Sequence, residues 1–278
     1  MTSSPVVRPT PDPNGPVAIS ADDLGVRYSL KLTKKQTVRD SLIRNLRRRG
    51  PTEFWALRHV SFKVVHGESL AVIGPNGAGK STLLQVLAGI ILPSAGEVAV
   101  DGRISTLLTL GVGFDEELSG RENIRLGGAF MGIDHRTVED RLQAIVDYAD
   151  LGPFIDAAIK TYSAGMRARL GFSIATSVEP DILLLDEVLA TGDAAFREKS
   201  KARVLELVRQ AKAIVLVTHD MGWVTEYCNR AMLIEKGEII LEGKPEDVVA
   251  LHEEHSEERR REAEAKGVLQ LRQDPFSR

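Results

Sequence analysis

A glycine-rich loop at residues 74–81 carries the residues best suited to chemistry, with the sequence Gly-Pro-Asn-Gly-Ala-Gly-Lys-Ser. It fits the pattern G-x-x-x-x-G-K-[ST] and lies between an expected strand at residues 70–73 and an expected helix at residues 80–88. Glycines let the backbone wrap closely around phosphates and turn its N–H groups inward, and the helix N-terminus adds partial positive charge. The pattern therefore predicts a nucleotide phosphate site rather than a glycine turn that happens to contain Lys-Ser.

Two side chains of this loop have distinct expected roles. Lys80 is expected to reach the β and γ phosphates of a nucleoside triphosphate, and the hydroxyl of Ser81 is expected to bind Mg²⁺. The residues expected to contact the nucleotide are Gly74, Pro75, Asn76, Gly77, Ala78, Gly79, Lys80, Ser81 and Thr82.

A second apolar strand, expected at residues 182–185, ends in two consecutive carboxylates, Asp186 and Glu187. Asp186 is suited to the Mg²⁺ shell, and Glu187 is suited to polarise the attacking water as a general base. Taken alone, an apolar run that ends in Asp-Glu is more often a strand that meets solvent. Downstream of a phosphate loop, the pair predicts the metal and base of a hydrolytic site.

Two further positions are weaker signals. Ser163 and Gly165 lie in a turn before an expected helix at residues 167–176, whose N-terminus could hold a phosphate. Since serine is a favoured N-cap, a simple capped helix is the better interpretation of that turn when it is taken alone. His219 directly follows an apolar strand, where a side chain faces the ligand crevice of a parallel sheet and could bind the γ-phosphate, although an isolated histidine more often has a structural role.

Strands and helices that alternate from Phe54 onward predict an α/β fold that positions these residues. We expect a proline-rich disordered tail at residues 1–16, a main domain at 17–250 and a charged helix or tail at 251–278. Within the main domain, residues 31–50 form a basic insertion, and residues from about 114 to 178 are mostly helical. A first short strand is expected at residues 17–28, and the exposed C-terminal helix, from residue 253, is supported by the i,i+4 pair of Glu257 and Arg261.

The composition excludes several classes of protein. The chain has 278 residues, 43% hydrophobic and 27% charged, with a net charge of −3, which argues against a dedicated nucleic-acid binder. The single cysteine, Cys228, excludes an intramolecular disulfide and a cysteine-rich metal site. Apolar runs are far shorter than the roughly 20 residues that span a bilayer, and the first residues contain no apolar signal core. We therefore expect a cytoplasmic protein, in which any membrane role must come through a partner.

Taken in order, these motifs resemble the ATP-binding subunit of ABC transporters over roughly residues 20–250. The resemblance implies a P-loop nucleotide-binding domain of ABC type, with a mixed sheet core and an inserted helical subdomain, that uses ATP and Mg²⁺. It makes residues 162–166 the signature turn, in which Ser163 and Gly165 close over ATP held by the other subunit of a homodimer. It makes Asp193 the D-loop carboxylate that reaches across this dimer, and His219 the switch histidine.

The same resemblance assigns the adenine contact to an aromatic residue at the end of the first strand. Tyr28 is the expected stacking residue, and Phe54 and Trp55 are its alternatives. Most ABC ATPases also have a glutamine before the helical region, and this sequence has none between residues 107 and 123. Asp115 and Glu116 are the candidates to complete the contacts to Mg²⁺ and water.

Finer motifs are similar to those of ATPases that export polysaccharides, such as O-antigen, capsule, teichoic acid and galactan. They lie at residues 107–114, 117–124, 162–166 and 186–196. This resemblance implies ATP-driven export of a lipid-linked polysaccharide with an integral membrane channel subunit, which would dock near Phe114. The alternatives are a non-transport ABC ATPase and a transporter of another substrate.

The basic insertion has two open interpretations. Its eight basic residues flank a narrow apolar stripe, so it is either a solvated loop or an amphipathic helix that contacts the membrane surface.

Overall fold

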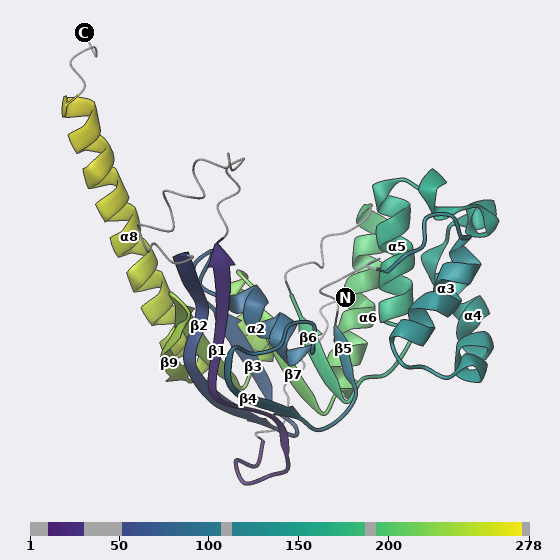
Figure 1. Ribbon diagram of the computed structural model, residues 1–278, viewed down its shortest axis with the longest axis horizontal. Coiled ribbons are helices and arrows are strands. Elements are labelled where there is room, and N and C mark those ends of the chain that lie inside the picture. Colours follow the sequence, from purple (N-terminus) through teal and green to yellow (C-terminus); the bar gives the residue numbers. More distant parts are fainter. Residues whose placement is uncertain (1–10, 31–51, 107–112, 187–192, 274–278) are drawn as a thin grey trace, which may run out of the picture.

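The computed structural model describes residues 11–30, 52–106, 113–186 and 193–273 of the chain (Figure 1). Residues 1–10 of the expected tail, the basic insertion and Glu187 lie outside the described residues. Among the helices that are described, none is long and apolar enough to cross a membrane.

A six-stranded sheet forms the centre of the molecule. Its strands are, in spatial order, β5 (Ile104–Thr106), β6 (Ile182–Leu185), β7 (Ala213–Val217), β3 (Ser69–Ile73), β8 (Arg230–Glu235) and β9 (Glu238–Gly243). The first five run parallel and β9 is antiparallel to β8, so the sheet is mixed, as expected. Every residue of β3, β6 and β7 is buried, because helices and a second sheet cover both faces.

Successive side chains along these strands pack into different hydrophobic clusters, because neighbouring residues of a strand face opposite ways. Leu70 and Val72 of β3 pack on the face covered by α2 (Lys80–Leu87), the helix that follows the phosphate loop. Ala71 and Ile73 pack on the other face, with α7 (Met221–Tyr227) and α8 (Pro245–Gln273). Next to them, α6 (Ala194–Gln210) covers the same face of β6 and β7.

A three-stranded antiparallel sheet covers α2 on its side away from the central sheet. Its strands are, in spatial order, β2 (Thr52–Val65), β1 (Val17–Leu30) and β4 (Ala95–Val100). The prediction of a short first strand is wrong, since β1 has 14 residues. It is long because its pairing with β2 extends from Val17 to Leu30, while β4 pairs with residues 19–25 along the other edge.

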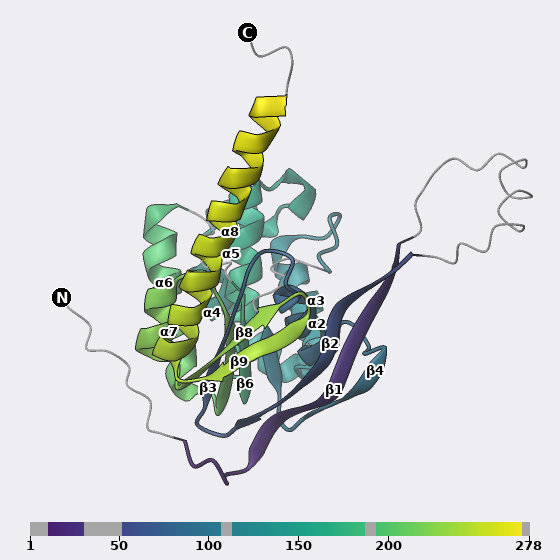
Figure 2. The ribbon, with the colours of Figure 1, turned by 90° about the vertical axis from the view of Figure 1, so that its left-hand side faces the viewer.

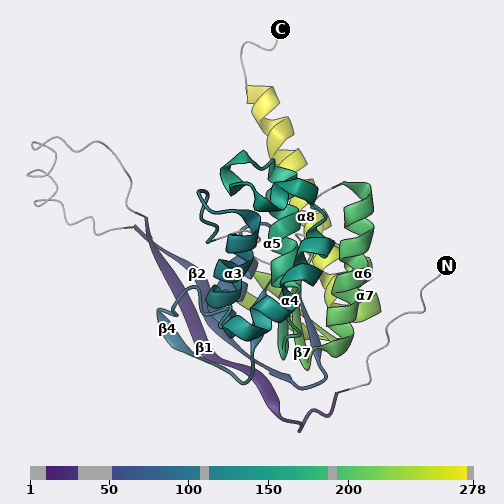
Figure 3. The same ribbon diagram turned by 90° about the vertical axis from the view of Figure 1, so that its right-hand side faces the viewer.

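The helical subdomain projects to one side of the two sheets and consists of α3 (Gly120–Phe130), α4 (His135–Ala149) and α5 (Ala164–Ala175) (Figures 1 and 3). Two 3₁₀ helices, Gly152–Asp156 and Ile159–Thr161, connect α4 to α5. Each α-helix begins at a side chain that accepts a backbone N–H, which contributes about 1 kcal/mol per cap. Apolar residues from the three helices form a core separate from that of the sheets.

The C-terminal helix α8 has 29 residues and begins at Pro245, eight residues before the predicted start at residue 253. Val248 and Val249 in its first turns are buried in the core, so the expected domain boundary at residue 250 falls inside this helix. Figure 2 shows α8 lying along β8 and β9 before its C-terminal part extends away from the body. The predicted exposed pair is confirmed, with 3.2 Å between Arg261 Nη2 and Glu257 Oε2.

Candidate nucleotide-binding site

The phosphate loop has a backbone path that only glycine can follow at two points. Gly74 has φ 147° and Gly79 has φ 108°, in the region that disfavours other residues. A Cβ atom at Gly74 would lie 2.0 Å from the carbonyl oxygen of Ile234, and one at Gly79 would lie 2.4 Å from that of Ala56. The loop is therefore wedged between β8 and β2, and its close backbone packing leaves no room for side chains.

Lys80 is the first residue of α2, and its side chain lies in the concave side of the loop with a relative exposure of 7%. Its Nζ donates hydrogen bonds to the carbonyl oxygens of Gly74, at 2.7 Å, and Pro75, at 3.0 Å. The N-cap residue, Gly79, has no side chain to accept the first N–H groups of α2. The helix N-terminus and the ammonium group thus present positive charge at the same place, which suits a phosphate.

Ser81 and Asp186 bring together the two oxygen ligands expected for Mg²⁺. The hydroxyl of Ser81 lies 3.5 Å from Oδ2 of Asp186, which directly follows β6. A hydroxyl and a single carboxylate are a fitting donor set, because Mg²⁺ bound with a nucleotide takes few protein ligands and completes its shell with water and phosphate oxygens. No cluster of three or more His, Cys, Asp or Glu side chains that could hold a metal occurs among the described residues.

The phosphate loop opens into a cavity of about 520 Å³ at the carboxyl ends of the central strands. It is lined by Tyr28, Phe54, Ala56, Asn76, Gly77, Ala78, Gly79, Lys80, Ser81, Thr82, Asp186, Val217 and His219. Lysine, hydroxyl, carboxylate and imidazole groups from three separate segments therefore converge on one space. The structure brings His219 to this cavity from the end of β7, as expected from its place after a parallel strand.

The register of β1 and β2 narrows the choice of aromatic residue for adenine. Tyr28 is directly opposite Phe54, and both line the cavity, with relative exposures of 38% and 50%. Trp55 faces the other side of the strand pair and packs under Arg27, whose Cζ lies 5.5 Å from the indole ring centroid. Trp55 therefore lies outside the cavity that the nucleotide would occupy, which favours Tyr28 or Phe54 over Trp55 as the stacking residue.

The signature turn and the D-loop carboxylate lie elsewhere. Ser163 is exposed and caps α5, where its Oγ accepts a hydrogen bond from the N–H of Met166 at 3.2 Å. Asp193 caps α6 by accepting from the N–H of Phe196 at 2.9 Å, and this hydrogen bond lowers the pKa of its carboxyl group. Neither residue lines the cavity, and nor does Gly165. Within one chain, the site therefore contains the phosphate loop, Asp186 and His219 but not these three residues.

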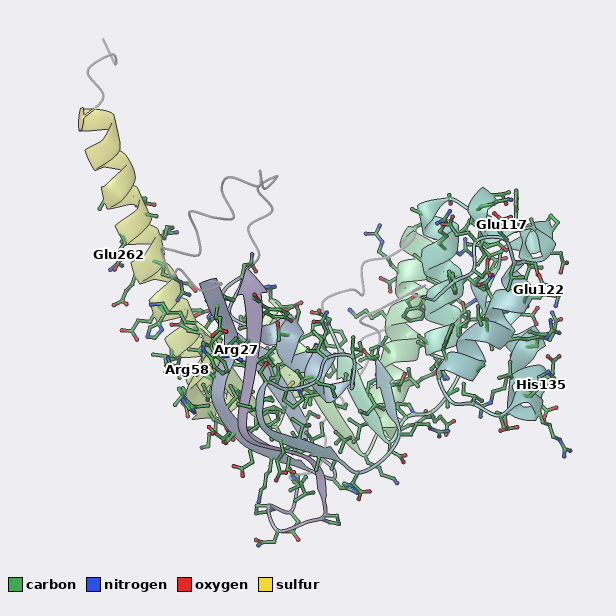
Figure 4. All side chains as sticks on the ribbon, viewed as in Figure 1. Arg27, Arg58, Glu117, Glu122, His135 and Glu262 are labelled. Carbon is green, nitrogen blue, oxygen red and sulfur yellow. The ribbon has the colours of Figure 1, made fainter. Side chains whose placement is uncertain are left out.

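The two acidic candidates for the missing glutamine also lie outside the cavity. Asp115 is held in a turn by Asn123, a fully buried residue whose side chain bonds both the N–H and the carbonyl of Asp115. Glu116 forms an ion pair with Arg167 of α5 at 2.7 Å. In Figure 4 the labelled neighbours Glu117 and Glu122 lie on the helical subdomain, far from Arg27 at the end of β1. The structure thus gives both candidates partners in the helical subdomain and does not bring them to the metal site.

Comparisons with known proteins identify the family. The sequence profile described as "ABC transporter" matches residues 57–190. An "O-antigen export system ATP-binding protein RfbB" of Klebsiella pneumoniae is 43% identical over 202 residues, which cover 73% of this chain and 82% of that protein. The chain belongs to the ABC transporter family.

Other similar proteins of this family are longer. "ABC transporter protein AbcA" of Aeromonas salmonicida is 46% identical over 70% of this chain, and the match covers 64% of that protein. "Teichoic acids export ATP-binding protein TagH" of Lactococcus lactis is 38% identical over 85% of this chain, and the match covers 51% of that protein. The chain thus spans between half and two thirds of the length of these curated relatives.

Solved structures confirm the fold. The dimeric post-hydrolysis structure of the ATP-binding cassette MJ0796, bound to ADP and Pi, superposes with a TM-score of 0.61 at 21% identity. The match covers 82% of this chain and 98% of that one. The predicted α/β fold and the resemblance to ABC ATP-binding subunits of polysaccharide export are therefore confirmed.

Proposed function

We propose that the protein is the ATP-hydrolysing subunit of an exporter that drives a lipid-linked polysaccharide across the cytoplasmic membrane. The observation that carries this proposal is the cavity in which Lys80, Asp186 and His219 converge. The substrate class is supported by similarity to proteins named for O-antigen and teichoic acid export. The glycan itself is not expected to touch the described nucleotide site.

The chemistry follows from the groups that line the cavity. Lys80 exchanges its loop carbonyls for the β and γ phosphate oxygens of ATP, while the N–H groups at the start of α2 bind the same phosphates. Ser81 and Asp186 would hold Mg²⁺, which neutralises phosphate charge as the terminal bond breaks. Glu187, which lies outside the described residues, acts as the general base for the attacking water, and His219 hydrogen-bonds the γ-phosphate.

Two copies of the chain complete each site. Ser163, Gly165 and Asp193 lie outside the chain's own cavity, so they contribute only if a second copy is turned head to tail against the first. ATP then lies between two helix N-termini, those of α2 in one subunit and α5 in the other. Hydrolysis removes the γ-phosphate contact and loosens the dimer, which gives a two-state element that the nucleotide controls.

An integral membrane channel subunit is the proposed partner, at the cytoplasmic face of the membrane. The helical subdomain supplies the docking surface near Phe114, which packs with one side against that subdomain's core. The basic insertion at residues 31–50, which lies outside the described residues, would contact the membrane surface in this arrangement.

Reconstitution tests the proposal against its alternatives. The chain is co-expressed with the membrane protein encoded beside it, purified into liposomes and supplied with Mg-ATP and a lipid-linked polysaccharide. We expect co-purification, substrate-stimulated ATPase activity and transport of the glycan, and Lys212→Ala should leave all three unchanged. At ATP concentrations near the wild-type KM, Lys80→Ala should lose most of the ATPase activity and transport. A chain that binds no membrane protein and whose ATPase responds to DNA or ribosomes instead would establish the non-transport alternative. Stimulation by a different substrate would establish the other one.

A further inference from the structure

Arg169 connects the signature turn and the D-loop carboxylate, two motifs that lie outside the nucleotide cavity of their own chain. It lies on α5, six residues after Ser163, and its side chain points towards α6, which begins at Asp193. One terminal nitrogen, Nη1, is 3.7 Å from Oδ2 of Asp193, and the guanidinium carbon is 5.1 Å from the ring centroid of Phe196 in the first turn of α6. The side chain of Arg169 therefore connects α5, which follows the signature turn, to Asp193, the N-cap of α6 and the expected D-loop carboxylate.

The other nitrogens of Arg169 fix the guanidinium group in this position. Nε donates to the carbonyl oxygen of Ala149 at 3.0 Å, and Nη2 donates to the carbonyl of Asp150 at 3.1 Å and to its carboxylate at 2.9 Å. These acceptors lie at the C-terminus of α4, where a cation is favoured by the helix dipole. Arginine is suited to this role because its planar fork directs several N–H groups in fixed directions, which a lysine ammonium cannot do.

An aromatic cluster beneath Arg169 makes the junction stiff. Tyr148 of α4, Phe172 of α5 and Phe196 of α6 have ring centroids 5.8–6.1 Å apart. Lys199 of α6 adds a hydrogen bond from its Nζ to the carbonyl of Tyr148 at 3.0 Å, and Tyr148 donates its hydroxyl to the carbonyl of Lys199 at 3.0 Å. Helices α4, α5 and α6 are thus packed as one unit, in which the angle between α5 and α6 depends on the groups that Arg169 joins.

We propose that Arg169 is a positioning residue that holds the signature turn and the D-loop carboxylate in one fixed relation, so that both reach the ATP of the partner subunit together. The proposal rests on the head-to-tail dimer of the proposed function. Asp193 already caps α6, so the ion pair is not needed to satisfy its carboxylate; what the contact adds is the direction of that carboxylate relative to α5.

A kinetic comparison separates positioning from simple stabilisation. Arg203 is the matched control, because it is also an arginine that donates to a carbonyl group at the end of a helix. Its Nη2 donates to the carbonyl of Thr176 at the end of α5, at 2.7 Å. Arg203 is not among the residues paired with Asp193. We expect Arg169→Ala to lower kcat by about tenfold or more with KM for ATP within about twofold, the pattern of a lost transition-state contribution. Arg203→Ala should lower Tm to a similar extent and leave kcat within about twofold.

Two outcomes of this comparison overturn the proposal. One is an equal loss of kcat in both variants at equal folded fraction, and the other is a loss in Arg169→Ala that appears only in KM. Arg169→Lys keeps the charge and guards against misfolding of the alanine variant. It should fold with a Tm close to that of the wild type and still lose most of the same kcat, because it lacks the fork; a lysine variant with full kcat would also contradict the proposal.

Mixing two impaired variants, at an ATP concentration near the wild-type KM so that the Lys80→Ala site stays mostly empty, tests whether Arg169 acts on the partner's ATP. Arg169→Ala keeps its own phosphate loop, and Lys80→Ala keeps its own Arg169, so a mixed dimer has one intact site. Random pairing makes half of the dimers mixed, and the mixture should recover about one quarter of wild-type ATPase activity. Recovery in this mixture supports the proposal.

The mixture of Ser163→Arg with Lys80→Ala is the reference, since Ser163 belongs to the signature turn itself. Recovery in the reference mixture without recovery in the Arg169→Ala mixture overturns the role of Arg169 alone. No recovery in the reference mixture overturns the head-to-tail arrangement, and the proposed function with it.

Discussion

Replacing Lys80 by alanine should weaken nucleotide binding rather than remove a catalytic step. The Nζ of Lys80 has two loop carbonyls as partners, at 2.7 and 3.0 Å, and the side chain is 7% exposed. The cost of burying its ammonium group is therefore incurred in folding, before ATP arrives. ATP binding exchanges these neutral acceptors for charged phosphate oxygens. The variant loses the difference in hydrogen-bond free energy between the two kinds of acceptor.

The expected size follows from the strength of an ionic hydrogen bond. Such bonds contribute about 1.5–3 kcal/mol, and each 1.4 kcal/mol changes a dissociation constant about tenfold. Because the lysine gives up existing hydrogen bonds, we expect the lower part of this range, and Kd for Mg-ATP should rise by about 10- to 50-fold. Isothermal titration calorimetry on the purified chain measures this value directly.

Lys212→Ala is the matched control, because it removes one positive charge from an exposed pair with Asp181 at 2.9 Å, away from the cavity. Its Kd should stay within about twofold of the wild type. Thermal unfolding shows whether either variant loses stability. A Lys80→Ala variant that folds normally and binds Mg-ATP within threefold of the wild type would refute the assignment of this loop as the phosphate site.

Four further substitutions test other parts of the site and fold. Glu187→Gln should bind ATP and trap a closed dimer but lose about 10²-fold or more in hydrolysis, measured as phosphate release; wild-type rates would place the base elsewhere. Tyr28→Ala and Phe54→Ala should show which ring stacks on adenine when the binding of ATP is compared with the binding of triphosphate alone. Only loss of the stacking ring should weaken the binding of ATP more than that of triphosphate. Equal effects on both ligands in both variants would exclude stacking. Asp134→Asn keeps the cap of α4 but removes the titrating group, whose pKa the hydrogen bonds from Thr137 lower below 3.8. The wild type should therefore have a higher Tm than the variant above about pH 5, and this difference should disappear as the pH falls through the lowered pKa. A difference in Tm that does not change with pH would contradict this.

The expected phosphate loop can be recognised from sequence because its residues are local. It needs a strand, eight residues and a helix, all contiguous at residues 69–87, and the structure has β3 and α2 at these positions. Asp186 and His219 follow buried parallel strands, and parallel strands end at the same edge of a sheet, so their meeting in one cavity also follows from the pattern.

Residues whose role depends on packing between elements were harder to predict. The length of β1 depends on its pairing with β2, which extends from Val17 opposite Val65 to Leu30 opposite Thr52. The position of Trp55 outside the cavity depends on the register of β1 and β2, since a shift of one residue would exchange the faces of Phe54 and Trp55. Arg169 and Asn123 carry no motif of their own, and their importance is visible only from the backbone groups they bind.

The structure also removes an apparent conflict about Ser163. From sequence, a capped helix and a phosphate contact are rival interpretations of the signature turn, because each assigns a different hydrogen-bond partner to the same serine hydroxyl. In the structure its Oγ accepts the N–H of Met166 at 3.2 Å, which is the capping role. A hydroxyl has one donor besides its two acceptor sites, so the same oxygen can cap α5 and donate its hydrogen to a phosphate that arrives from another subunit. In the proposed dimer, the cap would fix this oxygen at the helix N-terminus, in position for that contact. By contrast α2, whose N-cap is Gly79, has no side chain to do this and depends on the nucleotide itself.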